Sequence, residues 1–371
     1  MMRHGLFLMV IIFFAVSSKA GNDNVPEPFE WATALTLEAV GNTHGGVAKG
    51  TKSLGNLDAT LTIDTAQAGW WDGGTWFVYV LGNYGKNPSD MTGDLQTLSN
   101  ISTDNALKVY EFWYEQRFAN DAVKLLVGLH DYNSTFYALD SAGLFTVSSF
   151  GIGPDTAQVS PSIFSTTATA VQLTFQQRNM YLLLAVYDGV PGDPNNPRGT
   201  HVQFNRGDGL FNAAELGFMD GKKYKIAIGG WQKTTEEKNV INGQLSNQNH
   251  GYYIIGEKNI SENLTAFFQY GRADDAKNQL DEYTGAGLRL NNVWQENDAV
   301  GLGVAIAHNG APYVIQNANI ETAETILELT YFRPLVTHLN GQASIYYVKN
   351  PSMSPLLDNA LALGLRLYIE Y

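Results

Sequence analysis

The sequence predicts an all-β fold, a transmembrane antiparallel β-barrel of about sixteen strands with short periplasmic turns and long external loops. Three observations predict it. Short segments rich in Val, Ile, Leu, Tyr and Phe are separated by Gly, Asn, Asp and Pro, tight and long connections alternate, and the last segment has one wholly apolar face. Apolar runs after the N-terminus stay short of the roughly eighteen residues of a spanning helix, so we expect strands to cross the membrane.

The N-terminus, residues 1–20, is predicted to be a secretory signal peptide. Arg3 supplies a positive charge, Gly5–Val16 is a short apolar run, and Ser18–Ala20 provides the small residues that a signal peptidase recognises. A buried N-terminal core helix is the alternative, but the charge and cleavage pattern favour the signal peptide. Because no linker or composition break divides the remaining residues, 21–371, we expect them to form one barrel domain.

The composition limits the possible partners. The chain contains no cysteine and has a formal net charge of −13, which removal of residues 1–20 moves from −13 to −15 because two basic residues are lost. This acidity argues against nucleic acid, and the lack of cysteine suits an exported protein stabilised by a closed barrel. We expect no cofactor and no metal. Asp274 and Asp275 could bind Ca²⁺ outside the cell, but a solvated loop is the favoured interpretation.

Sixteen segments have the residue alternation expected of strands. They are residues 31–39, 55–65, 75–84, 107–118, 122–131, 168–176, 180–188, 211–218, 223–232, 250–259, 263–271, 283–290, 299–307, 321–333, 339–348 and 359–371.

The connections favour a membrane barrel over a soluble sandwich or propeller, which is the alternative fold. Tight turns are predicted at residues 119–121, 177–179, 219–222 and 260–262. Long connections are predicted at residues 41–54, 85–106, 132–167, 189–210, 233–249, 272–282, 308–320 and 349–358. An outer-membrane barrel has turns at its periplasmic end and loops outside, so it requires this alternation.

The last strand is the clearest single segment. In residues 360–371 every odd position is apolar, from Leu361 to Tyr371, whereas the even positions are small, polar or charged and include Arg366. A one-residue shift would place Arg366 in lipid, at a cost of roughly 2–4 kcal/mol, so we expect the odd positions to face the outer-membrane lipid. The terminal Tyr371 resembles the signal that the barrel-assembly machinery reads. Outward aromatic residues would serve lipid contact or a homotrimer equally well.

The same alternation assigns further side chains to the lumen. In residues 107–118 we expect the lipid-facing set to be Lys108, Tyr110, Phe112 and Tyr114. The lumen-facing set is then Val109, Glu111, Trp113, Glu115 and Arg117. Side chains cannot fill a barrel of about sixteen strands, so these polar faces line water.

From this strand onward the chain resembles the carbohydrate-selective porins of the OprB family. Residues 108–118, KVYEFWYEQRF, are similar to that family's LYELWYEQ strand, and residues 126–136 are similar to its GxxDxNxxF segment. Residues 141–154, SAGLFTVSSFGIGP, resemble its AGLFxNSSFGIGP pattern.

The resemblance extends from about residue 30 to the C-terminus. It implies a sixteen-stranded barrel for passive uptake of carbohydrates across the bacterial outer membrane, without enzymatic activity. Thr146, His130 and Thr135 depart from the family's Asn, Gln and acidic residue, which affects the expected sugar preference but not the fold.

A sugar pore needs hydrogen-bonding groups on its wall and flat apolar surfaces against which pyranose rings can stack. The inward candidates for these roles are Glu111, Trp113, Glu115, Arg117, Lys124, Glu215, Lys225, Trp231, Arg289, Glu324, Glu328 and Arg366. The alternative is that most of them brace the wall as a charge network. The alternative function is a general or cation-preferring diffusion porin without a sugar site.

The connection at residues 132–167 is predicted to fold inward and constrict the pore. It contains apolar residues that need burial, namely Phe136, Phe145, Phe150, Ile152 and Phe164, and the inner wall would provide it. An external cap over the barrel mouth is the alternative.

Enzyme functions have little support. The sequence contains neither an HExxH nor a GxSxG motif. His130 beside Asp131 is the one pair to check, and a hydrogen-bonded wall residue is its favoured interpretation.

Overall fold

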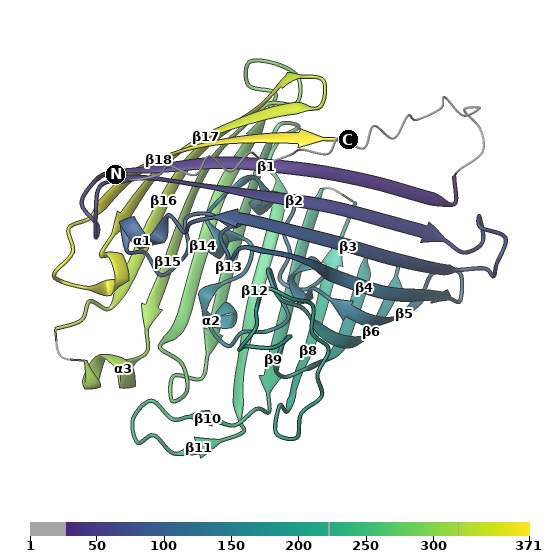
Figure 1. Ribbon diagram of the computed structural model, residues 1–371, viewed down its shortest axis with the longest axis horizontal. Coiled ribbons are helices and arrows are strands. Elements are labelled where there is room, and N and C mark those ends of the chain that lie inside the picture. Colours follow the sequence, from purple (N-terminus) through teal and green to yellow (C-terminus); the bar gives the residue numbers. More distant parts are fainter. Residues whose placement is uncertain (1–26, 222, 318) are drawn as a thin grey trace, which may run out of the picture.

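The computed structural model describes residues 27–221, 223–317 and 319–371, and the predicted signal peptide at residues 1–20 lies outside them. Within the described residues, sixteen strands form a closed antiparallel barrel in which the first strand pairs with the last (Figure 1). The predicted fold class is therefore confirmed. No helix in this part of the chain is long and apolar enough to cross a membrane.

The barrel strands have the following bounds: β1 (Phe29–His44), β2 (Gly50–Asp64), β3 (Gly74–Gly85), β4 (Ala106–Phe118), β5 (Val123–His130), β6 (Ala168–Gln177), β7 (Met180–Asp188), β8 (Leu210–Met219), β9 (Tyr224–Lys233), β12 (Asn249–Asn259), β13 (Leu264–Ala273), β14 (Leu280–Asn291), β15 (Ala299–Asn309), β16 (Ala323–Val336), β17 (Leu339–Lys349) and β18 (Ala360–Glu370). The connections hold the helices α1 (Ser89–Thr92), α2 (Pro154–Ala157) and α3 (Ala311–Gln316), and a hairpin of β10 (Glu237–Lys238) and β11 (Leu245–Ser246).

The prediction of a long connection at residues 41–54 is wrong. β1 and β2 continue almost to the bend, and their ladder still pairs Gly41 with Thr51 and Asn42 with Gly50. Glycine and asparagine suggested a loop, but backbone pairing inside the wall satisfies the N–H and C=O groups there and outweighs the weak strand preference of these residues.

The predicted faces of β4 are correct at its periplasmic end and wrong at its outer end. The register with β3 shifts between Tyr79, which pairs with Glu111, and Val80, which pairs with Val109. This bulge leaves Tyr110 as an extra residue and exchanges the two faces beyond it. Val109 is consequently exposed on the outside, whereas Lys108 and Tyr110 are buried.

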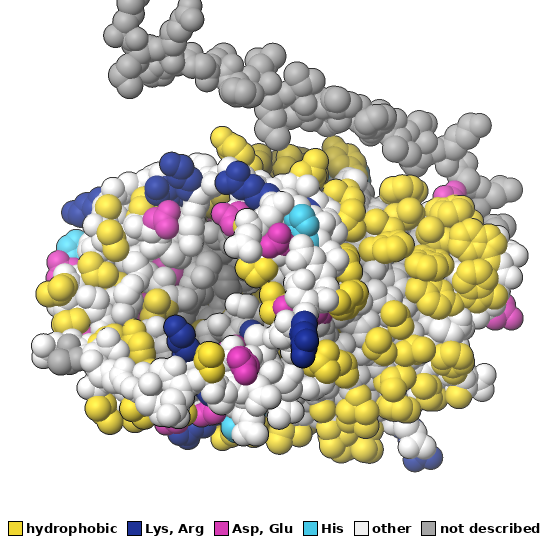
Figure 2. Space-filling model, turned by 60° about the horizontal axis from the view of Figure 1, so that its bottom comes forward, with side chains coloured by type: hydrophobic (Ala, Val, Ile, Leu, Met, Phe, Trp, Pro, Cys, Tyr) yellow, Lys and Arg dark blue, Asp and Glu magenta, His cyan; other side chains and the backbone are white. Residues whose placement is uncertain are grey.

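Elsewhere the outside of the wall is apolar, and charged side chains lie on its inside. In β18 the side chains of Leu361, Leu363, Leu365 and Leu367 are exposed on the barrel exterior, while Arg366 is buried inside. Figure 2 shows hydrophobic side chains over the outer wall and charged ones around the hollow of the barrel. An apolar exterior of this kind matches lipid, as the sequence predicts.

Loop L3 (residues 131–167), which joins β5 to β6, lies against the inner wall. Phe136, Phe145, Phe150 and Ile152 are buried there. They belong to one apolar cluster with inward residues of the wall, among them Tyr187, Trp231, Phe267 and Tyr346. Phe164 is less buried and contacts Tyr110 edge-on, with ring centroids 6.2 Å apart. L3 therefore occupies part of the space that the barrel encloses.

Candidate solute-binding site in the lumen

Carboxylates of the wall hold L3 through its backbone. Each accepts a hydrogen bond from an L3 main-chain N–H, which satisfies donors that a buried loop would otherwise leave unpaired. The donor and acceptor pairs are Asp131 to Glu111 (2.8 Å), Tyr137 to Glu215 (2.9 Å), Ser141 to Glu257 (2.8 Å) and Thr146 to Glu328 (3.0 Å).

Loop L2 (residues 86–105) is held in the same way. The wholly buried Glu324 accepts bonds from Leu95 N and Gln96 N at 3.0 and 3.2 Å, and from Ser352 N at 2.8 Å. Arg366 is also buried and donates to Glu38 at 2.9 Å. These two predicted site residues thus lie beneath loops, away from the open lumen.

Trp231 and Glu215 are covered as well. Trp231 Nε1 donates to Thr156 of L3 at 3.0 Å, and Glu215 accepts the hydroxyls of Tyr181 and Tyr253 at 2.6 and 2.5 Å. Of the twelve predicted site residues, six are buried among protein atoms: Glu111, Glu215, Trp231, Glu324, Glu328 and Arg366. Their contacts hold the inward loops, so a mobile solute has little access to them.

Four other predicted residues form one patch on β4 and β5. Trp113, Glu115, Arg117 and Lys124 are all partly exposed. Glu115 lies 4.0 Å from Lys124, and Arg117 lies 3.5 Å from Asp64 at the end of β2. Each pair offers hydrogen-bond donors and acceptors, and its two opposite charges nearly cancel.

Phe77 on β3 completes this patch and was missed by the sequence analysis. Its ring is stacked against Trp113 with centroids 4.9 Å apart and an interplanar angle of 24°. Phe77 pairs with Trp113 across the ladder, so it shares the inward face. Pairing the predicted strands 75–84 and 107–118 as antiparallel neighbours could have shown that Phe77 lies opposite Trp113.

The remaining predicted residues, Lys225 on β9 and Arg289 on β14, lie in another part of the wall. Lys225 Nζ donates to Ala138 O of L3 at 2.8 Å, and Arg289 Nη1 donates to Asp140 O at 3.4 Å. β14 is eight strands from β4 in either direction around the ring, so Arg289 and the β4 patch face each other across the barrel.

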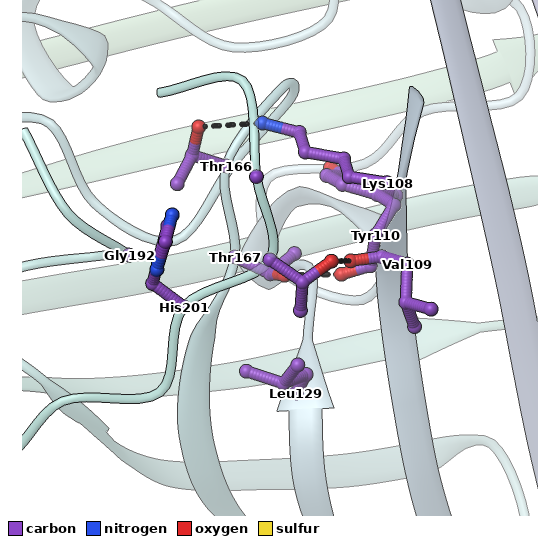
Figure 3. Close-up of a pocket in the computed structure, with 10 residues that line it drawn as sticks. Lys108, Val109, Tyr110, Leu129, Thr166, Thr167, Gly192 and His201 are labelled. Atoms are coloured by element: carbon purple, nitrogen blue, oxygen red, sulfur yellow. Dashed lines mark hydrogen bonds between the residues drawn. The ribbon is translucent and has the colours of Figure 1, made fainter. Parts of the chain in front are cut away.

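A small cavity lies away from this patch, between β4 and the loop that follows β7 (Figure 3). Lys108 enters it and donates to Thr166 Oγ1 at 3.1 Å, and Thr167 donates to the carbonyl of Tyr110. The ladder between β4 and β5 does not extend to this part of β4, and these bonds cover the strand edge that it leaves open. The cavity has room for about one water molecule.

His130 is buried and hydrogen-bonded to its neighbours in the wall. Its Nδ1 lies 2.9 Å from the Tyr187 hydroxyl, whereas the carboxylate of Asp131 accepts the Tyr110 hydroxyl at 2.5 Å. Ser134 lies 3.2 Å from His130 Nε2, but its hydroxyl donates to Asp131 O at 2.6 Å. Within the described residues, no group of three or more His, Asp or Glu side chains could hold a metal ion.

A closed barrel with an apolar exterior, charged side chains around its lumen and inward loops defines the class of channel-forming outer-membrane proteins. Residues 48–371 match the family model described as carbohydrate-selective porin, OprB family. The chain belongs to the OprB family of carbohydrate-selective porins of the bacterial outer membrane. The resemblance seen in the sequence is thus confirmed.

Solved structures share the fold at low sequence identity. The chain is similar to Pseudomonas putida OprB at high pH, with TM-score 0.82 and 16% identity over 93% of this chain and 94% of that one. The low-pH structure of the same protein gives TM-score 0.60 and 13% identity over 93% of each chain. A mutant of the Rh. blastica porin gives TM-score 0.58 and 11% identity over 92% and 100%. A comparison with curated proteins gave no match.

Proposed function

We propose that small sugars crossing this porin bind at the β2–β5 wall, on the surface formed by Phe77, Trp113, Glu115, Arg117 and Lys124. The stacked pair of Phe77 and Trp113 beside two charge pairs is the observation that carries the proposal. It combines on one face the two kinds of surface that a sugar requires.

The chemistry suits a pyranose. The aliphatic face of the ring packs on an aromatic plane, while its hydroxyls exchange water for carboxylate and amino groups. Because each charge has an opposite partner, an inorganic ion gains little by binding there, and a neutral polyol gains hydrogen bonds. The contacts remain weak and exposed, so bound sugar leaves again and flux continues.

The buried glutamates have a supporting role in this proposal. They hold L2 and L3 against the wall, and L3 thereby sets the width of the passage beside the patch. We infer that the chain acts as a channel and not as an enzyme, since the family to which it belongs is a family of porins.

The proposal also includes the lipid around the barrel and the machinery that assembles it. The apolar exterior contacts outer-membrane lipid, and the barrel-assembly machinery recognises the C-terminal strand. In support, Tyr371 is exposed and stacks on His338, with ring centroids 4.7 Å apart. Assembly into a homotrimer, cleavage of residues 1–20 and Ca²⁺ binding by Asp274 and Asp275 stay predictions.

Ion current through the reconstituted protein tests the proposed function. Purified protein in a planar bilayer is recorded while glucose and maltose are titrated. Saturable, sugar-dependent block is expected, because a sugar on the patch excludes ions from the narrowed passage. Open channels with a current indifferent to both sugars would support the alternative, a general or cation-preferring porin.

A further inference from the structure

The tip of L3 is fastened to the wall mainly through its backbone. Lys225 donates to Ala138 O at 2.8 Å, and Glu257 accepts from Ser141 N and Oγ at 2.8 and 2.6 Å. Asp140 N donates to Glu257 at 3.3 Å, and Arg289 donates to Asp140 O at 3.4 Å. Three charged side chains from β9, β12 and β14 therefore hold the segment 138–141 through three of its four residues, Ala138, Asp140 and Ser141.

The carboxylate of Asp140 takes no part in this attachment. The side chain is exposed, and among the described residues it has no hydrogen bond or close ion pair, although the Arg289 guanidinium is near enough to attract it electrostatically. An ionised carboxylate only accepts hydrogen bonds and has about four acceptor positions. A fixed backbone thus presents a charged acceptor whose positions are all free.

This carboxylate lies deep in the barrel. Lys225 is the second residue of β9, and Glu257 and Arg289 are each the third residue from the end of β12 and β14. These strand ends adjoin the short turns at 220–223, 260–263 and 292–298, which mark the periplasmic side. The tip of L3 therefore descends through most of the barrel, and Asp140 is exposed to the lumen rather than to the outside.

Asp140 is also at the right height to face the proposed sugar patch. Glu115 and Arg117 lie within four residues of the periplasmic end of β4, and β4 is opposite β14 in the ring. The passage at this level runs between the β4 patch on one side and the L3 tip on the other.

We propose that Asp140 is a specificity-determining residue of the pore, which accepts hydrogen bonds from vicinal sugar hydroxyls and rejects anionic sugars. The role in sugar binding rests on the proposed function above. Two neighbouring hydroxyls can share one carboxylate, and charge-assisted bonds of this kind are about twice as strong as neutral ones. A sugar phosphate or uronate that bonds to this carboxylate brings a second negative charge against it, beyond the one that Arg289 attracts, and is disfavoured relative to a neutral sugar.

The charge test exploits the absence of cysteine from the sequence. Asp140→Cys introduces a unique thiol that methanethiosulfonates can label with a negative or a positive group. The wild-type channel should prefer K⁺ to Cl⁻, and Asp140→Cys should lower the K⁺/Cl⁻ permeability ratio by about threefold. The negative label should restore this ratio, and the positive label should invert the preference. Asp90→Cys, at an exposed carboxylate on α1 in L2, is the matched control and should respond to neither label.

The sugar test uses the isosteric Asp140→Asn in the same bilayer. Block by glucose should weaken by about tenfold, and the preference for glucose over glucuronate should narrow by a similar factor. Labels without effect on the current or on ion selectivity would overturn the placement of Asp140 in the pore. Wild-type block by glucose that persists unchanged in Asp140→Asn would overturn its role in specificity. Absence of glucose block in the wild type would instead overturn the proposed function, while the labelling result still decides whether Asp140 faces the lumen.

Discussion

Glu38 and Arg366 face each other in the ladder between the first and the last strand, and Arg366 Nη2 donates to Glu38 Oε2 at 2.9 Å. Both side chains are buried, and Ser99 of L2 also donates to Glu38. One ion pair therefore joins the ends of the barrel sheet and attaches L2 to that junction.

Removing one partner of this pair should be costly. Arg366→Met leaves the Glu38 carboxylate buried without its cation, and we expect a loss of about 3–5 kcal/mol in the free energy of unfolding. The double variant Glu38→Leu with Arg366→Met should recover most of that loss, because no buried charge remains. Urea unfolding of the detergent-folded barrel measures both, and a double variant as unstable as Arg366→Met would contradict the explanation.

Trp113→Ala should weaken sugar binding without disturbing the fold. Loss of the stacking surface next to Phe77 is expected to raise the half-blocking concentration of glucose by about 5- to 10-fold, which corresponds to about 1 kcal/mol. Trp294→Ala is the control, because Trp294 is 71% exposed on the turn before β15. Equal block in both variants would remove Trp113 from the sugar site.

Glu328→Ala should release L3 from the wall. Glu328 is wholly buried and accepts Thr146 N, Val147 N and Thr146 Oγ1 at 3.0, 3.1 and 2.9 Å. We expect a destabilisation of about 2–4 kcal/mol and a noisier single-channel current, since buried N–H groups lose their acceptor. Glu262→Ala, on the exposed turn after β12, should change neither quantity. A quiet current in a fully folded Glu328→Ala channel would speak against L3 setting the passage width.

The packing of L3 should be more stable in mild acid than in base. Burial within L3 raises the pKa of Asp155 to about 7, although the hydroxyl of Thr156 partly offsets the shift. A carboxyl whose pKa is higher in the folded state costs nothing below its unfolded pKa near 4, and its cost grows as the pH rises to about 7.

Asp155→Asn should therefore raise the unfolding free energy at pH 8 by a few kcal/mol and have little effect at pH 4. Unfolding midpoints of the wild type and the variant at pH 4, 6 and 8 measure the difference. A benefit that is the same at all three pH values would show that the titration of Asp155 is not its source.

Alternation along the strands predicted much of the wall. A period of two assigned the outer leucines and the inner Arg366 of β18 correctly, because every residue of a regular strand simply follows the pleat. The same rule failed at Lys108 and Tyr110, since a bulge adds one residue and nothing in the local sequence marks its position.

By itself, the sequence determined the sixteen-stranded barrel, its apolar outer face and its family, because these depend on local alternation and on motifs that are continuous in the chain. It could not separate inward residues that line the passage from those that hold loops. Glu115 and Glu328 look alike in their strands, yet one is partly exposed and the other is wholly buried under L3. Only the tertiary structure decided this, because the path of L3 depends on contacts with strands up to two hundred residues away.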